Sequence, residues 1–321
     1  MRRRRFLLAA GALAFAPLGR AQQPNRSYRV GVLLPIAEAA DRHLSVISDH
    51  LAKHGFVQDR NLTLDVRYSK TDPDAAQSLV DLKPDAILAA STNSVQAAQA
   101  ATKTVPVVFT WVADPVLLGI VKNYARPGGN ITGITNRYLE LAAKRLELVR
   151  ALLPAAKRVA GAGPFQEPEA AAALRVARQA ARRLELELIV QPPFDSAYNL
   201  LRSVLKSGSQ AILAFAQYEA LGLRFAAANL VQVLAEKRMP CVFADTGTVA
   251  MGGLISYATN LDDDLRQGVD LISRVLKGDK PADLPVEQAS RFELAINLKT
   301  ARALGLTIPQ SLLLRADRVI E

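Results

Sequence analysis

The sequence predicts an α/β protein with two doubly wound parallel-sheet lobes joined by hinge crossings. The chain has 321 residues, which is about twice the ~150 residues expected of one domain. Half of the residues are hydrophobic and 22% are charged, a composition that excludes intrinsic disorder and supports a large core. Apolar runs typical of buried parallel strands alternate with helical segments, and this alternation restarts near residue 158.

The N-terminus has the parts of an export signal in the expected order. Arginines at positions 2–5 precede an apolar stretch over 6–17, and Gly19 and Ala21 place small residues at a cleavage site. The apolar stretch would span only about 18 Å as a helix, too short for a ~30 Å membrane core. We therefore expect residues 1–21 to be a signal peptide cleaved near Ala21. Its arginines fit the twin-arginine pattern, with the general secretory route as the alternative.

In the first half of the mature chain, strand and helix patterns follow one another. Residues 28–35 form a near-continuous apolar run ending in proline, as in a strand buried on both faces. Leu62, Leu64 and Val66 show the period-2 spacing of another strand. We expect strands at 28–35, 61–68, 85–90, 106–112 and 131–135, and helices at 41–54, 73–82, 94–102 and 114–124.

A long amphipathic helix over 139–153, closed by Pro154, carries the chain into a second half. We expect lobe 1 to comprise residues 28–137 with part of 258–321, and lobe 2 to comprise 138–257 with the remainder of the C-terminal segment. Ligands of such sheets sit at the carboxyl ends of the strands, here in a cleft between the lobes. The further strands are expected at 158–163, 186–191, 210–216, 240–244 and 253–257, with an apolar segment at 292–298, and the helices at 167–184, 197–207, 219–237, 262–277, 300–304 and 309–320.

Charge and cysteine content exclude several functions. The formal net charge is +10, from 40 basic and 30 acidic residues, but five of the arginines lie in the first 21 positions. No basic patch with interleaved aromatic residues remains, so no nucleic-acid partner is expected. The single cysteine, Cys241, excludes an intrachain disulfide and a multi-cysteine metal site.

The sequence contains no complete catalytic, metal or cofactor motif. His50 and His54 are spaced to share a metal on one helix, but no third ligand is evident and we expect ordinary surface histidines. Gly161 and Gly163 resemble part of a dinucleotide-binding turn whose third glycine is replaced by Gln166, so a structural turn is expected. We expect no catalytic residue, no metal and no cofactor.

Polar and aromatic residues at strand ends are the candidate ligand-binding residues. Those of 91–94 follow a strand and open a helix, where they can bind a carboxylate, cap the helix, or do both. Trp111 is either a core residue or the floor of a pocket, and Asp114 either caps a helix or receives an ammonium group. The candidates are Ser91, Thr92, Asn93, Ser94, Trp111 and Asp114 in the first half, and Phe165, Gln166, Glu167, Tyr218, Glu219 and Asp245 at strand ends of the second.

Motifs spread over nearly the whole mature chain resemble one known family. Examples are Arg29-Val-Gly-Val-Leu-Leu-Pro35 and Ala125-Arg-Pro-Gly-Gly-Asn-Ile-Thr-Gly133, with further matches at 54–62, 83–88, 105–109, 113–116, 278–285, 292–298 and 299–306. Together they resemble the periplasmic substrate-binding proteins of ABC transporters, in the type I fold and the group related to tryptophan and aromatic amino-acid binders. The resemblance implies two hinged lobes with a small ligand between them.

Carried over by position, residues 91–94 look like the family's hydroxyl-rich loop that receives a ligand carboxylate, and Asp114 stands at its Asp-Pro. The second-lobe loops 163–167 and 216–219 depart from the family pattern. The resemblance therefore implies a monomeric periplasmic binding protein that captures a small polar or amino-acid-like ligand, or a small carboxylate, and delivers it to an inner-membrane ABC permease. An exported α/β enzyme that uses cleft carboxylates and a periplasmic sensing subunit for a signalling receptor are the alternatives.

Overall fold

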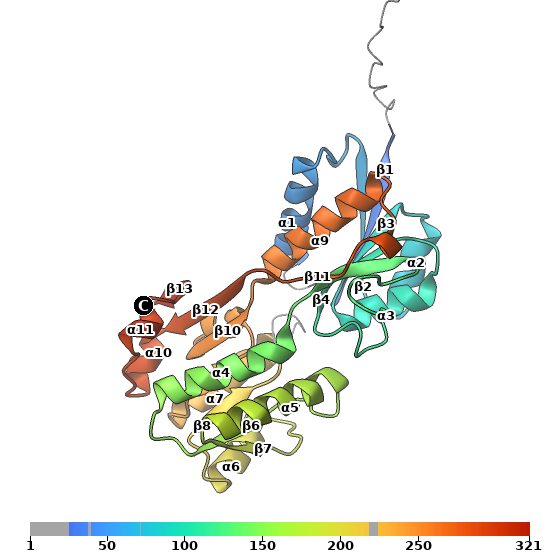
Figure 1. Ribbon diagram of the computed structural model, residues 1–321. Coiled ribbons are helices and arrows are strands. Elements are labelled where there is room, and N and C mark those ends of the chain that lie inside the picture. Colours follow the sequence, from blue (N-terminus) through green and yellow to red (C-terminus); the bar gives the residue numbers. More distant parts are fainter. Residues whose placement is uncertain (1–25, 38–39, 71, 218–223) are drawn as a thin grey trace, which may run out of the picture.

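The computed structural model describes residues 26–37, 40–70, 72–217 and 224–321, which form two β-sheets, each with helices on both faces (Figure 1). The expected signal peptide lies outside the described residues. Within the described part of the chain, no helix combines the length and the apolar character needed to cross a membrane. We call the sheet that contains β1, with its helices, the first lobe, and the other sheet, with its helices, the second lobe.

The first lobe is built on a six-stranded sheet of order β11-β5-β4-β3-β1-β2, in which all pairs are parallel. Alternate residues of β1 face opposite helix layers, because Val32 packs with α1 and α9 whereas Leu33 packs with α2 and α3. The strands are β1 (Tyr28–Leu34), β2 (Leu62–Tyr68), β3 (Ala86–Ala90), β4 (Val107–Val112), β5 (Ile131–Thr135) and β11 (Glu287–Gln288), and the helices are α1 (Ala40–Lys53), α2 (Ala75–Asp81), α3 (Thr92–Ala101) and α9 (Leu261–Leu276).

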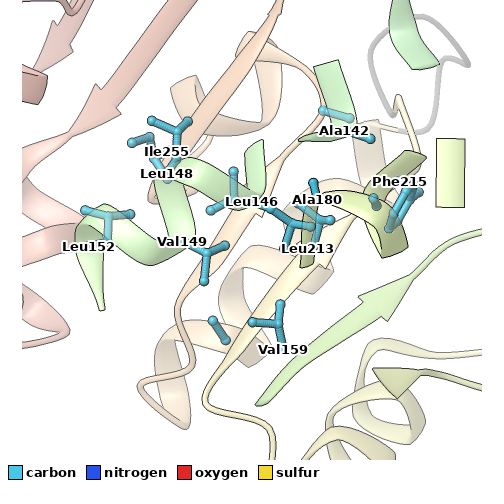
Figure 2. Close-up of a cluster of buried hydrophobic side chains, with 14 of the residues drawn as sticks. Ala142, Leu146, Leu148, Val149, Leu152, Val159, Ala180, Leu213, Phe215 and Ile255 are labelled. Atoms are coloured by element: carbon cyan, nitrogen blue, oxygen red, sulfur yellow. The ribbon is translucent and has the colours of Figure 1, made fainter. Parts of the chain in front are cut away.

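The second lobe is built on a seven-stranded sheet of order β13-β12-β10-β9-β8-β6-β7, in which only the β10–β12 pair is antiparallel. Figure 2 shows its core, where Leu146 and Val149 of α4 pack with Val159, Leu213 and Ile255 of the sheet. The strands are β6 (Arg158–Ala162), β7 (Glu187–Val190), β8 (Ala211–Ala214), β9 (Cys241–Phe243), β10 (Ile255–Thr259), β12 (Phe292–Asn297) and β13 (Arg318–Ile320). The helices are α4 (Tyr138–Leu152), α5 (Pro168–Arg183), α6 (Ala197–Lys206), α7 (Arg224–Glu236), α8 (Thr246–Ala250), α10 (Leu298–Ala303) and α11 (Gln310–Leu313), and a 3-10 turn, η1 (Pro281–Asp283), precedes β11.

The chain passes between the lobes at three places in the described residues: from β5 to α4, from β10 to α9, and from β11 to β12. The C-terminal segment is therefore divided, because α9 and β11 join the first lobe while β12 and β13 join the second. The predicted α/β class with two mainly parallel, doubly wound sheets is confirmed.

Two expected helices are wrong. The segment 114–124 forms hydrogen-bonded turns instead, with Gly119 in the left-handed region at φ +68°, which interrupts a right-handed helix. Of 309–320 only α11 is helical, because residues 318–320 pair with β12 as β13. The backbone N–H of Asp317 donates to Leu294 O, and its carboxylate accepts from Leu294 N, which fixes the start of that pairing. The helical periodicity of residues 318–320 is therefore overridden by their pairing with β12.

Candidate functional site

A cleft of about 420 Å³ lies between the two lobes, within the ~300–1,000 Å³ range of small-molecule sites. It lies at the carboxyl ends of the strands, where ligands of parallel sheets bind. The first lobe contributes residues that follow β1 to β4, and the second contributes residues that follow β6 and β8 and the first turn of α5. The polar and aromatic side chains that line it belong to Ser69, Lys70, Ser91, Thr92, Asn93, Gln96, Trp111, Tyr138, Glu167, Glu169, Phe215 and Gln217.

The predicted loop 91–94 lies at the cleft, and Ser91 caps α3. Ser91 Oγ accepts a hydrogen bond from the backbone N–H of Ser94, at 3.4 Å, as an N-cap does. Ser94 Oγ lies 2.8 Å from Ser69 Oγ and is fully buried, so it does not line the cleft. Thr92 and Asn93 do line it. Some residues of the loop therefore cap the helix, and others line the cleft.

Glu169, in the first turn of α5, bridges the two lobes. Its Oε1 accepts hydrogen bonds from Thr92 Oγ1 at 3.1 Å and from the backbone N–H of Ala113 at 3.2 Å, both in the first lobe. Burial raises the pKa of Glu169, while these two hydrogen bonds work in the opposite direction. The side chain of Glu169 thus joins α5 of the second lobe to Thr92 and Ala113 of the first lobe.

Trp111 is both a core residue and part of the cleft wall. Its Nε1 donates to Leu261 O at 3.1 Å, and its ring packs edge-on against His43 at 5.0 Å between centroids. Burial lowers the pKa of His43, which favours the neutral imidazole against the indole. Trp111 has a left-handed backbone, φ +60°, and is 5% exposed. The two predicted roles of this residue therefore coexist.

On the second-lobe side, Tyr138 and Phe215 form the aromatic wall. The hydroxyl of Tyr138 donates to Phe215 O, and the fully buried Arg145 donates to Tyr138 O and stacks 5.2 Å from its ring. Phe165 packs edge-on against Phe215 at 5.0 Å, but it is not among the residues that line the cleft. Phe165 therefore supports the wall from behind.

The predicted acids Asp114 and Asp245 do not line the cleft. Asp114 Oδ1 accepts from the backbone N–H groups of Val116 and Leu117 and from the hydroxyl of Tyr124. Asp245 caps α8, since its Oδ1 accepts from the N–H and the hydroxyl of Thr248, each at 2.8 Å. In this structure both acids stabilise the chain segment that follows a strand.

The remaining predicted residues are separated. Glu167 lines the interlobe cleft and also a neighbouring cavity beside α6 and α7, whereas Gln166 lines only that second cavity. Tyr218 and Glu219 lie outside the described residues.

Sequence reasoning did not single out Lys70, Glu169, Tyr138 and Phe215. Lys70 and Phe215 follow the ends of β2 and β8, so the strand-end rule applied elsewhere would have found both. Glu169 has no such signal, because an acid in the first turn of a helix is expected from the helix dipole alone. The contacts of Glu169 with Thr92 and Ala113 become visible only in the tertiary structure, where α5 faces the first lobe.

Residues 29–320 match the sequence model of a protein family described as ABC transporter substrate binding protein. This chain belongs to that family. The resemblance inferred from the sequence is confirmed. Because the family is one of binding proteins, this substrate-binding protein is not an enzyme.

Two individual proteins are similar to most of this chain. A tyrosine-binding protein of Clostridioides difficile (strain R20291) is 28% identical over 261 residues, which is 80% of this chain and 74% of the relative. The crystal structure of an ABC domain in complex with L-Trp, from Streptococcus pneumonia, is 28% identical with a TM-score of 0.79, and the match covers 92% of this chain and 100% of that one.

A more distant match shows the fold alone. A periplasmic binding protein/LacI transcriptional regulator from Alkaliphilus metalliredigens, solved with D-xylulofuranose, is 14% identical with a TM-score of 0.54, over 84% of this chain and 97% of that one. The predicted type I fold is confirmed.

Proposed function

We propose that this substrate-binding protein holds an aromatic amino acid, such as tryptophan or tyrosine, between its lobes and delivers it to an ABC permease in the inner membrane. Two of the similar proteins bind tyrosine and L-Trp according to their names. The observation that carries the proposal is the composition of the cleft, in which aromatic rings, hydroxyl and amide groups, and side chains of both charges line one space. A zwitterion with an aromatic side chain complements that combination.

The carboxylate of the ligand is assigned to the N-terminal end of α3. Asn93 and Thr92 form its first turn, where unpaired backbone N–H groups and the helix dipole favour an anion. Lys70, which lines the same side of the cleft, adds a positive charge.

The ammonium group is assigned to Glu169, with Glu167 beside it on the cleft wall. Thr92 and Ala113 already orient Glu169 through its Oε1, and its other oxygen is the acceptor that we assign to the ammonium. Trp111, Tyr138 and Phe215 then contact the aromatic side chain, through edge-on or offset-stacked ring contacts.

Closure of the lobes follows from this assignment. Glu169 belongs to the second lobe, and Thr92 and Ala113 of the first lobe donate hydrogen bonds to it. A ligand that binds both Glu169 and the end of α3 therefore contacts both lobes, and it can do so only when the lobes are closed. Ligand affinity for the closed form then shifts the equilibrium toward closure. We propose that the moving units are the expected lobes, residues 28–137 and 138–257 with the C-terminal segment shared between them, and that the chain works in the periplasm as a monomer after export.

The experiment is calorimetric titration of the mature chain, refolded from denaturant to remove any co-purified ligand, with each of the common amino acids. We expect binding to be restricted to aromatic amino acids and to be lost with tyramine, which lacks the carboxylate. Glu169→Gln removes the negative partner of the ammonium, and we expect it to weaken binding by about 10- to 100-fold, the range for a hydrogen bond to a charged group.

Glu187→Gln is the matched control. Glu187 is an exposed carboxylate on β7 that pairs with Arg158 and does not line the cleft. Its replacement is expected to leave the affinity unchanged. The proposal fails if no aromatic amino acid binds, or if both substitutions weaken binding equally.

A further inference from the structure

A cluster of metal-ligating side chains lies on the first lobe, on a different part of the lobe from the cleft. It consists of His50 and His54, at the C-terminal end of α1, and Asp270 of α9. Figure 1 shows α1 and α9 side by side on one face of the sheet. Because α1 starts at the carboxyl edge of the strands and runs back across the sheet, its C-terminal end lies at the opposite edge from the cleft.

We propose that His50, His54 and Asp270 form a binding site for one Zn²⁺ or a similar borderline transition-metal ion. Each histidine Nε2 lies close to the same carboxylate oxygen, Asp270 Oδ1: 2.8 Å from His50 and 2.7 Å from His54. The three atoms lie within 4.8 Å of one another. The sequence offered only the two histidines, and the fold supplies the third ligand from a position 216 residues beyond His54.

The chemistry of the three groups selects the ion. Two imidazole nitrogens with one carboxylate oxygen suit Zn²⁺, which commonly takes three protein ligands and leaves a fourth position to water. Mg²⁺ and Ca²⁺ prefer sites made of oxygen ligands alone, so they are poor occupants. The end of α1 favours a cation as well, because backbone carbonyls give a helix C-terminus a partial negative charge.

The site has room to adjust to an ion. Ligand atoms around a tetrahedral Zn²⁺ stand about 3.3 Å apart, given bonds of about 2.0 Å, so each imidazole has to move away from Asp270 by about half an ångström. The Asp270 side chain is 50% exposed, and those of His50 and His54 are 18% and 28% exposed, which leaves the carboxylate free to turn and a path for the ion.

One feature limits the affinity. Nδ1 of His50 is buried and has no hydrogen-bond partner among the described residues. When Nε2 binds the ion, the proton of the neutral ring moves to Nδ1, where it lacks the acceptor that metal-bound histidines usually have. We therefore expect weaker binding, by about tenfold or more, than a site with both rings supported.

The composition of the chain makes the test simple. It has three histidines and one cysteine, and both His43 and Cys241 are buried. The experiment is competition between the mature chain, without an affinity tag, and a chromophoric chelator for Zn²⁺. We expect one Zn²⁺ per chain, no measurable competition for Mg²⁺, and at least a tenfold loss of Zn²⁺ affinity in His54→Gln, in His50→Gln and in Asp270→Asn.

Asp49→Asn is the matched control, because Asp49 is an exposed acid beside His50 on the same helix. A second readout is the imidazole ¹⁵N spectrum, in which Zn²⁺ should shift the signals of His50 and His54 but not those of His43. Circular dichroism and unchanged amino-acid binding show that each variant folds. The site is overturned if no Zn²⁺ binds, if binding survives replacement of both histidines, or if Asp49→Asn weakens it as much as Asp270→Asn.

Discussion

Ser91 and Trp111 both have a left-handed backbone, with φ of +91° and +60°, although neither is glycine. Such conformations cost ~1–3 kcal/mol each and persist only where neighbouring contacts hold them. The helix cap formed with Ser94 holds Ser91, and the hydrogen bond from its indole to Leu261 holds Trp111. Both residues line the cleft, so strain is concentrated where the proposed ligand binds. Glu169 adds a buried acid to the same place.

Glu169 should make the stability of the ligand-free protein depend on pH. Burial raises its pKa in the folded chain, so folding tightens its hold on a proton. Protonated Glu169 therefore contributes to the free energy of unfolding at pH values below its pKa in the unfolded chain. This contribution is lost as the pH rises through the higher pKa of Glu169 in the folded chain. Between about pH 4 and pH 8 we expect the melting temperature of Glu169→Gln, relative to wild type, to rise with pH. Parallel melting curves for the two proteins across this range would contradict the prediction.

The position of α9 depends on close approach to the first sheet. A Cβ on Gly268 would lie 2.4 Å from Thr110 Cγ2 of β4, so only glycine permits this contact. Asn260 begins the helix, because its side-chain oxygen accepts from Asp263 N at 2.9 Å immediately after a chain crossing. The start of α9 is thus fixed at the point where the chain crosses from β10 to the first lobe. From there α9 brings Asp270 to His50 and His54.

Gly268→Ala should destabilise the protein by about 1–3 kcal/mol through overpacking between α9 and β4. The measurement is chemical denaturation followed by circular dichroism. Gly161→Ala is a suitable comparison, since Gly161 is also buried but an added Cβ there meets its nearest atom at an ordinary 3.4 Å. Equal losses for the two variants would show that the α9 contact is not special.

At the scale of the molecule, three chain crossings connect the lobes within the residues that the structure describes, and the cleft lies between the lobes. The single tryptophan of the chain lines that cleft, so its fluorescence provides a label-free test of the proposed closure.

Tyrosine should change the emission of Trp111 as the lobes close, because closure changes the solvent and polar groups around the indole. N-acetyl-tyrosinamide, which has neither the ammonium nor the carboxylate, should leave it unchanged. Excitation at the red edge of tryptophan absorption avoids the ligand's own signal, and Trp111→Phe, which removes the one tryptophan of the chain, should abolish the response. Binding of tyrosine without any change in emission would contradict closure around this residue.

Much of the fold, and the position of some residues that line the candidate site, followed from local sequence. Near-continuous apolar runs such as β3 marked strands buried on both faces, and the polar residues after β3 marked the cleft end of that strand. These signals depend on neighbours within a few residues, so the sequence determined them without tertiary information. It also determined the family, through motifs spread between Arg29 and Leu306.

Tertiary structure alone decided the groupings that join distant segments. Glu169 reaches Thr92 across 77 residues, and Asp270 reaches His50 across 220. Residues 318–320 formed a strand because β12 offered an unpaired edge, whatever their own periodicity favoured. A local pattern records which face of an element is apolar, but it does not record which other element covers that face. Only the packed chain, in which burial and hydrogen bonding are satisfied together, selects those partners.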